Sequence, residues 1–474
     1  MNLKDKFPAK DPITKILEKI AKVAHENRIN IYLVGGAVRD KIMDRQSTDI
    51  DICVIGDAIS FAEKFGNTVG RENIITYPKF GTAMVPFHHY VVEFATARSE
   101  VYEENSRKPI IRKSTLKDDL LRRDFTINAM AMSLNREDMY DLIDEFEGLA
   151  DIDEFTIRTP LNPIETFSED PLRMLRAVRF ATQLNFRIEP YTFAAIAEVK
   201  ERMNIISQER ITEELRKMMM SDFPPSQGFA LLKQCGLLDI ILPEIADLEG
   251  VDQSGKFHHK DVFWHTLEVL DNVARVSDKF ELRFAALVHD IGKPDTKQFI
   301  EGKGWSFHGH EIVGTHKVHR LCTRMKLPNK VRDYAKKLTK LHLRPIALAD
   351  EGVTDSAVRR MMVEAGEELD DLMKLCRADI TSKNPDKVKE YTSNFDHVEE
   401  YITEVEERDK MRAFQSPVRG DEIMQEFNLK PGREVGIIKK ELEELILDGI
   451  IPNDYAAVKN YLLDHKEKFR EMIN

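Results

Sequence analysis

Apolar and polar positions repeat along the chain with two different periods, the two-residue alternation of strands and the spacing of helices. The alternation is the commoner of the two in the first hundred residues. An apolar run at residues 31–34 and an alternating run at 49–54 predict two strands. Residues 80–87 and 90–95 predict a hairpin for the same reason. Residues 13–26 instead place apolar side chains at helical spacing, which predicts an amphipathic helix packed on the outside of the sheet.

Beyond about residue 160, helical spacing replaces the alternation of strands. Residues 386–412 show it most clearly, because their apolar positions recur every three or four residues between charged ones. The chain is too long for one core, and we expect three or four domains. The predicted fold class is α+β, in which a small mixed sheet forms a head and the rest is helical. The predicted domains are a catalytic head at 1–160, a helical neck and body at 161–250, a metal-binding domain at 251–390 and a helical tail at 391–474.

Composition narrows the class of protein. The net charge of −12 argues against a generally basic coat for nucleic acid, although a local basic groove is compatible with it. The cysteines are scattered without the spacing of a disulfide pair or a zinc site, which is typical of reduced thiols in a cytoplasmic protein. The first ten residues lack the apolar core of a signal peptide, and no apolar run has transmembrane length.

Candidate chemistry begins where the first strand ends. The pair Gly35 and Gly36 makes a tight turn ahead of a short helix, and backbone N–H groups at such a turn bind anions. Asp49 and Asp51 lie on one face of the second strand, roughly 7 Å apart. Mg²⁺ takes carboxylate and phosphate oxygens together. The arrangement therefore predicts a site for a nucleoside triphosphate and Mg²⁺.

The segments LVGGAVRD and STDIDICV together resemble the signature of class II nucleotidyltransferases, the family of tRNA CCA-adding enzymes and bacterial poly(A) polymerases. The resemblance implies that Asp49 and Asp51 are catalytic metal ligands and that Glu93 is a third carboxylate beside them. It also implies that Gly35, Gly36 and Arg39 hold the triphosphate. A mobile loop over residues 97–109 would close over the substrates.

Two further motifs carry the same resemblance. RRDFTINA, at residues 122–129, resembles the family segment in which Arg122, Asp124 and Asn128 hold the ribose and phosphates. EDPLRMLRAVRF, at residues 169–180, resembles the nucleotide-reading helix. There Asp170 and Arg173 select C or A at the base edge, and Arg176 orients them. On a continuous helix Asp170 and Arg173 share a face.

A second group of residues suits a different metal. His265, His289, Asp290 and Asp379 combine imidazole and carboxylate, which bind Mn²⁺, Ni²⁺, Fe²⁺ or Mg²⁺. Together they resemble the HD phosphohydrolase superfamily, which implies metal-dependent hydrolysis of phosphoesters or a role limited to tRNA binding. His310 and His342 are candidates for a second metal.

The last hundred residues and the neck resemble non-catalytic parts of the same family. Residues 414–454 resemble its RNA-gripping helical hairpin, in which Lys430, Arg433, Lys439 and Lys440 would meet tRNA phosphates. Residues 208–215 resemble a neck motif, for which we expect a packing role.

The resemblance implies Mg²⁺-dependent addition of CCA to the 3′ end of tRNA from CTP and ATP, with release of pyrophosphate. A poly(A) polymerase, a CC-only enzyme and an A-only enzyme share these motifs and stay open. An HD phosphohydrolase with a vestigial head is the alternative from another class. The sequence does not decide the oligomeric state.

Overall fold

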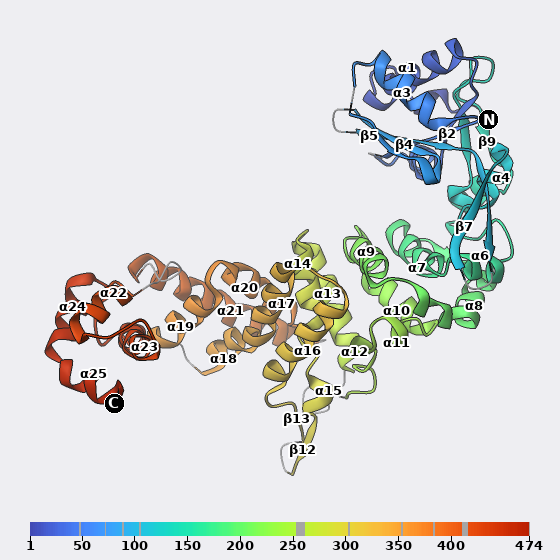
Figure 1. The fold of residues 1–474 in the computed structure, drawn as a ribbon. Helices are drawn as coiled ribbons and strands as arrows, with labels where there is room; N and C mark the ends of the chain where they lie inside the picture. The colour runs from blue at the N-terminus through green and yellow to red at the C-terminus, as the bar shows by residue number, and fades with distance from the viewer. Residues whose placement is uncertain are drawn as a thin grey trace. The chain divides into compact units, whose positions relative to one another are not determined.

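The computed structural model describes residues 1–473 apart from 47–48, 72, 88–89, 104–105, 253–260, 302–303, 352–353, 383 and 410–415. It divides into two compact units, Met1–Ile241 and Leu242–Asn474 (Figure 1). We call them unit 1 and unit 2 and describe each by itself. The finer division into four domains stays a prediction.

A mixed sheet organises the first half of unit 1. Among the described residues its strands run in the order β3-β4-β5-β2-β1-β8-β9, and β2 pairs with β5 in parallel while the other neighbours are antiparallel. The strands of unit 1 are β1 (Ile31–Val34), β2 (Asp49–Val54), β3 (Ile75–Tyr77), β4 (Thr82–Phe87), β5 (Tyr90–Thr96), β6 (Arg98–Glu103), β7 (Ser106–Lys113), β8 (Ala131–Ser133), β9 (Leu142–Ile143), β10 (Thr156–Ile157) and β11 (Arg187–Ile188).

Helices cover the sheet and then continue the unit. Asp11 caps the first helix by accepting a hydrogen bond from the Ile13 amide, and Pro12 opens it. The helices of unit 1 are α1 (Pro12–Glu26), α2 (Gly36–Ile42), α3 (Ala58–Thr68), α4 (Leu116–Leu121), α5 (Gly148–Asp153), α6 (Pro163–Glu169), α7 (Leu172–Leu184), α8 (Pro190–Val199), α9 (Gln208–Met219), α10 (Ser226–Gln234) and α11 (Leu238–Ile241), with 3₁₀ turns at Lys4–Lys6, Pro78–Phe80, Thr126–Asn128 and Lys200–Ile205.

Apolar and acidic residues alternate in β2, so one face of the strand packs in the core and the other carries the two aspartates. Ile50, Ile52 and Val54 are fully buried, and α3 packs on the neighbouring strands β4 and β5. Asp49 and Asp51 point to the opposite face. The predicted strands at 31–34 and 49–54 are confirmed residue for residue, because burial fixes the register of an alternating strand.

Residues 97–109, expected as a mobile loop, are largely in β6 and β7, which pair as an antiparallel hairpin. The turn at 104–105 and the side chains of 99–113 lie outside the described part of the chain. Closure over a substrate therefore stays a prediction.

Unit 2 is helical apart from one small hairpin. Its elements are α12 (Pro243–Ala246), α13 (Val262–Val276), α14 (Phe280–Val288), α15 (Lys293–Thr296), β12 (Gln298–Ile300), β13 (Gly304–Ser306), α16 (His310–Arg324), α17 (Asn329–Leu341), α18 (Leu343–Glu351), α19 (Asp355–Ala365), α20 (Leu369–Ala378), α21 (Pro385–Asp409), α22 (Gly420–Phe427), α23 (Arg433–Leu447), α24 (Tyr455–Asp464) and α25 (Lys466–Ile473), with a 3₁₀ turn at Gly366–Glu368.

The long helix α21 follows the predicted helix at 386–412, and the predicted boundary between residues 390 and 391 falls inside it. Phe395, Val398 and Ile402 are buried on one side, and the helix contacts α18 and α19. Beyond it, α22 to α25 enclose a separate apolar cluster around Ile438.

The predicted α+β class, with a mixed-sheet head and helices elsewhere, is confirmed. All four cysteines are buried and unpaired. Among the helices that the structure describes, none combines the length and hydropathy needed to cross a membrane.

Candidate functional site

The glycine turn after β1 is shaped for a close approach. Gly35 has φ 72° and ψ −138° and precedes the first residue of α2. A Cβ atom there would lie 2.7 Å from Nη1 of Arg123 and 3.7 Å from Oδ2 of Asp51. A side chain at Gly35 would therefore be strained and would collide with the site. The turn brings backbone, arginine and carboxylate within contact distance.

The parallel pairing of β2 and β5 gathers the predicted carboxylates. Asp51 is in register with Glu93, and Asp49 is in register with Val91. Glu93 therefore lies beside Asp51 on the same face of the sheet. The pKa of Asp51 is raised to about 6, mainly by burial; Arg123 opposes the rise, and Glu93 and Asp49 contribute to it. Such a crowded carboxylate group fits a divalent cation.

Arg122 and Arg123 share one buried partner that the sequence interpretation missed. Asp119, in α4, is 1% exposed and accepts hydrogen bonds from Nη2 of Arg122 at 2.7 Å and from Nη2 of Arg123 at 3.1 Å. The signal was present in the sequence, since Asp119 stands three and four residues before the two arginines on one helix face. Asp119 holds both guanidinium groups, and that of Arg123 lies beside the glycine turn.

A hydrogen-bonded chain links the other predicted nucleotide-binding residues. Nη1 of Arg39 donates to Oδ1 of Asn128 at 2.6 Å, and Nδ2 of Asn128 donates to Oδ1 of Asp124 at 3.0 Å. Arg176 then donates from Nε and Nη2 to Oδ2 of Asp124, at 2.8 and 2.6 Å. Burial alone would raise the pKa of Asp124, but Arg176 and Asn128 outweigh it and hold that pKa well below its usual range.

The expectation that Asp170 and Arg173 share a face of one helix is wrong. α6 ends at Glu169 and α7 begins at Leu172, so Asp170 lies between them with extended backbone, φ −130° and ψ 98°. The reason is Pro171, because a residue before proline is forced out of the helical region.

Each member of this pair has its own partners. Oδ2 of Asp170 accepts from Nη2 of Arg210 at 2.9 Å. Arg173 is buried, and it donates to the carbonyl of Arg122 at 2.6 Å and to Oε2 of Glu169 at 3.2 Å.

The neck helix α9 does more than pack. Besides Arg210, it supplies buried Glu214, whose Oε2 is 2.6 Å from Nε of Arg179 and whose Oε1 is 3.7 Å from Nη1 of Arg176. The sequence interpretation assigned α9 a packing role because its apolar spacing is strong. Its two charged contacts appear only when α7 and α9 lie side by side.

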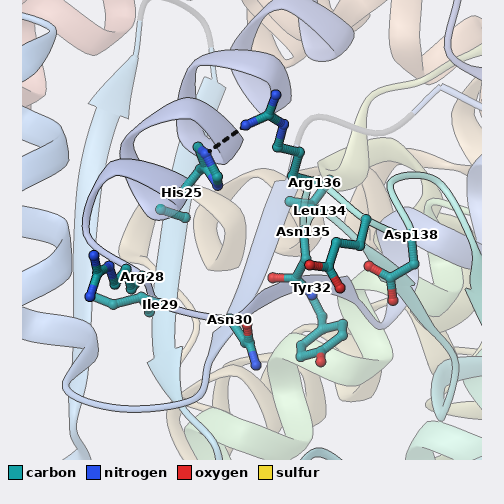
Figure 2. Close-up of a pocket in the computed structure, with 11 residues that line it drawn as sticks. His25, Arg28, Ile29, Asn30, Tyr32, Leu134, Asn135, Arg136 and Asp138 are labelled. Carbon is teal, nitrogen blue, oxygen red and sulfur yellow. Dashed lines mark hydrogen bonds between the residues drawn. The ribbon is translucent and has the colours of Figure 1, made fainter.

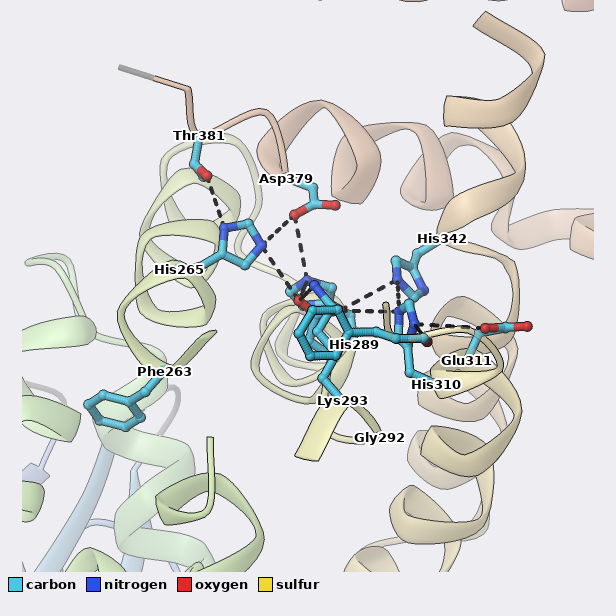
Figure 3. A network of polar contacts seen from close by, with 12 residues as sticks. Phe263, His265, His289, Gly292, Lys293, His310, Glu311, His342, Asp379 and Thr381 are labelled. Atoms are coloured by element: carbon cyan, nitrogen blue, oxygen red, sulfur yellow. Dashed lines mark hydrogen bonds and ion pairs between the residues drawn. The ribbon is translucent and has the colours of Figure 1, made fainter. Parts of the chain in front are cut away.

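Unit 2 places its predicted metal ligands mostly at helix ends. His289 and Asp290 directly follow α14, His342 follows α17, and Asp379 follows α20. A helix C-terminus carries partial negative charge, so three helices favour a cation here. His310 opens α16, and His265 comes from within α13. Figure 3 shows these side chains converging.

The ligand atoms form two groups that share one neighbourhood. His265, His289 and Asp379 make the first, and Asp290, His310 and His342 make the second; within each group the atoms lie within 4.8 Å of one another. Asp290 faces both groups. Its Oδ2 is 3.2 Å from Nε2 of His289, and its Oδ1 is 3.4 Å from Nε2 of His310.

Hydrogen bonds on the far side of each ring fix the tautomer. Nδ1 of His289, His310 and His342 donates to a backbone carbonyl, at 2.8, 2.8 and 2.7 Å. Nδ1 of His265 bonds the Thr381 hydroxyl at 2.9 Å. This leaves Nε2 of each ring for a ligand, as in metal sites where a polar partner orients the histidine.

The inner atoms lack satisfactory partners within the protein. Nε2 of His289 is buried without a hydrogen bond, Oδ1 of Asp379 faces another candidate ligand atom, Nε2 of His265, at 2.8 Å, and Oδ2 of Asp290 forms an ion pair with Lys293. Nε2 of His310 and Nε2 of His342 face each other at 3.2 Å, and burial lowers the pKa of His342 to about 3, so its Nε2 is unprotonated. A cation between such atoms would satisfy them all.

The glycine that follows the His-Asp segment has a packing reason, and the next residue, Lys293, contacts Asp290. A Cβ atom at Gly292 would lie 2.2 Å from the carbonyl oxygen of His310, so only glycine lets this turn approach α16. Nζ of Lys293 lies 2.6 Å from Oδ2 of Asp290. The sequence interpretation gave this lysine no role, although it stands three residues after Asp290.

The predicted RNA-contacting residues lie along the start of α23. Arg433 and Lys440 are exposed, and Lys439 is half-buried with Nζ 3.8 Å from Oε1 of Glu443. Lys430, just before the helix, is also exposed. A phosphate backbone has access to these positions.

A hollow of about 990 Å³ lies elsewhere on unit 1 (Figure 2). Its walls come from the start of β1 and the residues after β8, including Tyr32, Arg136 and Asp138. These strands are antiparallel, so the hollow lies at the opposite strand end from Gly35. None of the predicted site residues lines it.

Three family models match parts of the chain. The poly A polymerase head domain matches residues 31–158, the probable RNA and SrmB-binding site of polymerase A matches residues 185–248, and the HD domain matches residues 262–384.

Relatives with a common name match most of the chain. The Multifunctional CCA protein of Pseudoalteromonas atlantica (strain T6c / ATCC BAA-1087) is 32% identical over 423 residues, covering 85% of this chain and 98% of the relative. The protein of the same name from Thioalkalivibrio sulfidiphilus (strain HL-EbGR7) is 37% identical over 322 residues, covering 66% and 74%.

Among solved structures, the Thermotoga maritima CCA-adding enzyme complexed with tRNA_CCA has a TM-score of 0.63 at 22% identity, with 98% of each chain covered. A structure named CCA-adding enzyme apo form II has a TM-score of 0.66 at 23% identity, covering 98% and 99%. At these identities the two structures establish the fold alone.

Proposed function

The chain belongs to the family of the multifunctional CCA proteins, and from this premise we propose that it adds C and A from CTP and ATP to the 3′ end of tRNA. The observation that carries the proposal is the register of Asp51 with Glu93 beside the glycine turn. This arrangement gathers carboxylates for Mg²⁺ next to backbone amides for a triphosphate.

Asp49, Asp51 and Glu93 would hold Mg²⁺, which fits the raised pKa of Asp51. When bound there, Mg²⁺ supplies charge neutralisation for the triphosphate and activation of the RNA 3′-hydroxyl, and pyrophosphate leaves in line. Gly35, Gly36 and Arg39 would bind the triphosphate. Arg123, which touches the glycine turn, would join them.

Nucleotide selection would depend on the junction between α6 and α7. Asp170 and Arg173 would bond the base edge, while Arg122, Asp124 and Asn128 hold ribose and phosphates. Arg176 would act as a positioning residue, since both of its donors go to Asp124. Arg210 would keep the Asp170 carboxylate in place until a base arrives.

For unit 2 we propose a metal-dependent phosphohydrolase with one cation in each ligand group and Asp290 between them. A divalent cation such as Mn²⁺, Ni²⁺, Fe²⁺ or Mg²⁺ bound there supplies Lewis acidity and an activated water for phosphoester hydrolysis. Lys293, whose Nζ lies 2.6 Å from Oδ2 of Asp290, would bind the substrate phosphate. The observation that favours this second activity is the convergence of six mostly buried candidate ligands in two groups.

In the tail, Arg433, Lys439 and Lys440 would contact tRNA phosphates, independently of sequence. Because its substrates would be tRNA, CTP and ATP, we place the protein in the cytoplasm, where its four buried thiols would stay reduced.

The test of the transferase uses purified protein, Mg²⁺ and three tRNA transcripts, ending before CCA, after C and after CC. Each receives CTP, ATP or both. We expect all three to grow to CCA and stop. Addition of C alone or of the last A alone would identify a split-specificity enzyme, and long A tails would identify a poly(A) polymerase. Absence of incorporation would overturn the transferase and leave unit 2 as the working site.

A further inference from the structure

Hairpin β12–β13 carries an aromatic pair that nothing in the described chain covers. Phe299 is 66% exposed and Trp305 is 40% exposed, although large aromatic side chains are usually buried. The two residues are cross-strand partners, with ring centroids 5.3 Å apart and planes at 75°. Nζ of Lys297 lies 4.6 Å from the centre of the Trp305 ring. In Figure 1 the hairpin projects from the helices around α15 and α16.

The chain inserts this hairpin between two candidate metal ligands. Asp290 lies seven residues before Lys297, and His310 lies four residues after Ser306. At no more than about 3.6 Å per residue, Trp305 is within roughly 18 Å of His310. A molecule bound to Phe299 and Trp305 would therefore lie within a similar distance of the candidate metal ligands.

The base of the hairpin is hydrogen-bonded to one of the candidate metal ligands. The carbonyl of Phe307 accepts from Nδ1 of His310 at 2.8 Å and from the Thr296 hydroxyl at 3.4 Å. Nζ of Lys293, beside Asp290, lies 5.6 Å from the Phe307 ring centre. A ligand held by the hairpin would thus be held in a defined position relative to the ligand groups.

We propose that Phe299, Trp305 and Lys297 form a base-stacking platform that holds the single-stranded 3′ end of an RNA for the metal centre of unit 2. Aromatic rings stack on bases of any sequence, and a neighbouring cation attracts the phosphate backbone. This inference assigns a binding surface beside the proposed hydrolase site and so rests on that proposed function.

Binding of RNA explains the exposed aromatic pair and Lys297 better than a purely stabilising role in the hairpin does. A cross-strand aromatic pair stabilises a short hairpin, but that role would not require Lys297 or the exposure of both residues. An apolar protein partner would meet lysines and the polar metal centre beside it. A phosphate-linked chain of bases complements the rings, Lys297 and Lys293 together.

A fluorescence titration tests the platform directly. The chain has two tryptophans, so Trp264→Phe leaves Trp305 as the sole reporter. We expect a five-nucleotide RNA ending in CCA to quench Trp305 saturably in the full-length protein, with EDTA present. Phe299→Ala should weaken binding about fivefold to 100-fold, the range for losing one stacked base. Ile300→Ala is the matched control, since Ile300 is exposed on the other face of the same hairpin, and it should change nothing.

Hydrolysis provides the second readout. On Mn²⁺- or Ni²⁺-loaded protein, Phe299→Ala should raise KM about fivefold to 100-fold for an RNA 2′,3′-cyclic phosphate and leave bis(p-nitrophenyl) phosphate unaffected. If the protein cleaves neither ester, the hydrolase proposal fails, and the titration alone decides the platform. Unchanged quenching in Phe299→Ala would overturn the platform. So would loss of self-association in Phe299→Ala without loss of RNA binding, which would identify a contact between copies.

Discussion

The carboxylates of the head lie on neighbouring strands, whereas the ligand atoms of unit 2 lie mainly at helix ends. Asp49 is exposed and Asp51 is half-buried, but His289 and Asp290 are fully buried. The head supplies carboxylates alone, while unit 2 supplies imidazoles with their far nitrogens already bonded.

The difference corresponds to two kinds of cation. An open group of carboxylates leaves coordination positions for substrate phosphates, as Mg²⁺ requires. A closed group of imidazoles and carboxylates favours a transition metal that stays bound between turnovers. We therefore expect the head to acquire its metal with the nucleotide and unit 2 to keep its metal.

The largest effect should follow from removing the head carboxylates. Asp49→Ala combined with Asp51→Ala should lower nucleotide addition about 10³-fold or more, since several kcal/mol of charge stabilisation is lost at about 1.4 kcal/mol per tenfold. Incorporation of labelled CTP and ATP into tRNA measures this. Metal content and phosphoester hydrolysis in unit 2 should stay unchanged. Loss of both activities would show that the two sites are coupled.

The number of metal ions retained per chain should distinguish the role of Asp290 from that of Asp379. Asp290→Ala removes the carboxylate between the two groups and should abolish retention of both cations, whereas Asp379→Ala should leave about one per chain. Elemental analysis after loading with Mn²⁺ or Ni²⁺ and desalting checks this. Asp278→Ala, at an exposed acid of unit 2, is the control. Equal retention in the Asp290 and Asp379 variants would contradict the two-group arrangement.

Breaking the chain of hydrogen bonds in the head should cost stability as well as activity. Asp124→Asn should lower the free energy of unfolding of unit 1 by about 2–4 kcal/mol, somewhat less than for a fully buried pair because Arg176 is one-third exposed. The folded pKa of Asp124 is depressed, so its stabilisation is present above the unfolded pKa of about 3.9 and is lost as the pH falls below it. Urea unfolding of both proteins at pH 7 and pH 3 measures the loss; a difference that grows on acidification would refute the assignment.

A smaller effect is expected at the partner of Asp170. Arg210→Ala frees the carboxylate and should reduce discrimination of CTP and ATP against UTP and GTP about three- to tenfold, mainly through KM. Competition between nucleotides during incorporation measures the ratio. Arg216→Ala, on the same helix but exposed, should leave the ratio unchanged. An equal fall in kcat for every nucleotide would instead indicate a structural role for Arg210.

Local patterns predicted most of the sheet and both metal ligand sets. The alternation in 49–54 fixed the strand, its buried face and the shared face of Asp49 and Asp51. The His-Asp pair and its distant partners were identified by residue type, and the structure brings all six candidate ligands together. Such features depend on neighbours in sequence or on chemistry that has few alternatives.

The predictions that were wrong or incomplete have a common cause. Asp170 was assigned to a continuous helix because the effect of Pro171 on the preceding backbone was overlooked. Arg210 and Glu214 were assigned to packing because their partners lie about 35 to 40 residues away in the chain. Sequence spacing carries no information on such pairs.

The sequence by itself determined the class of fold, the glycine turn, the strand that bears the carboxylates and the residue types of the candidate metal ligands. Only the tertiary structure decided that Glu93 stands beside Asp51, that Asp290 faces two ligand groups and that Phe299 and Trp305 stay uncovered. The physical reason is the distance along the chain over which each interaction acts. Backbone alternation and turn sterics act over a few residues, whereas strand register and helix contacts depend on burial of surfaces far apart in the chain.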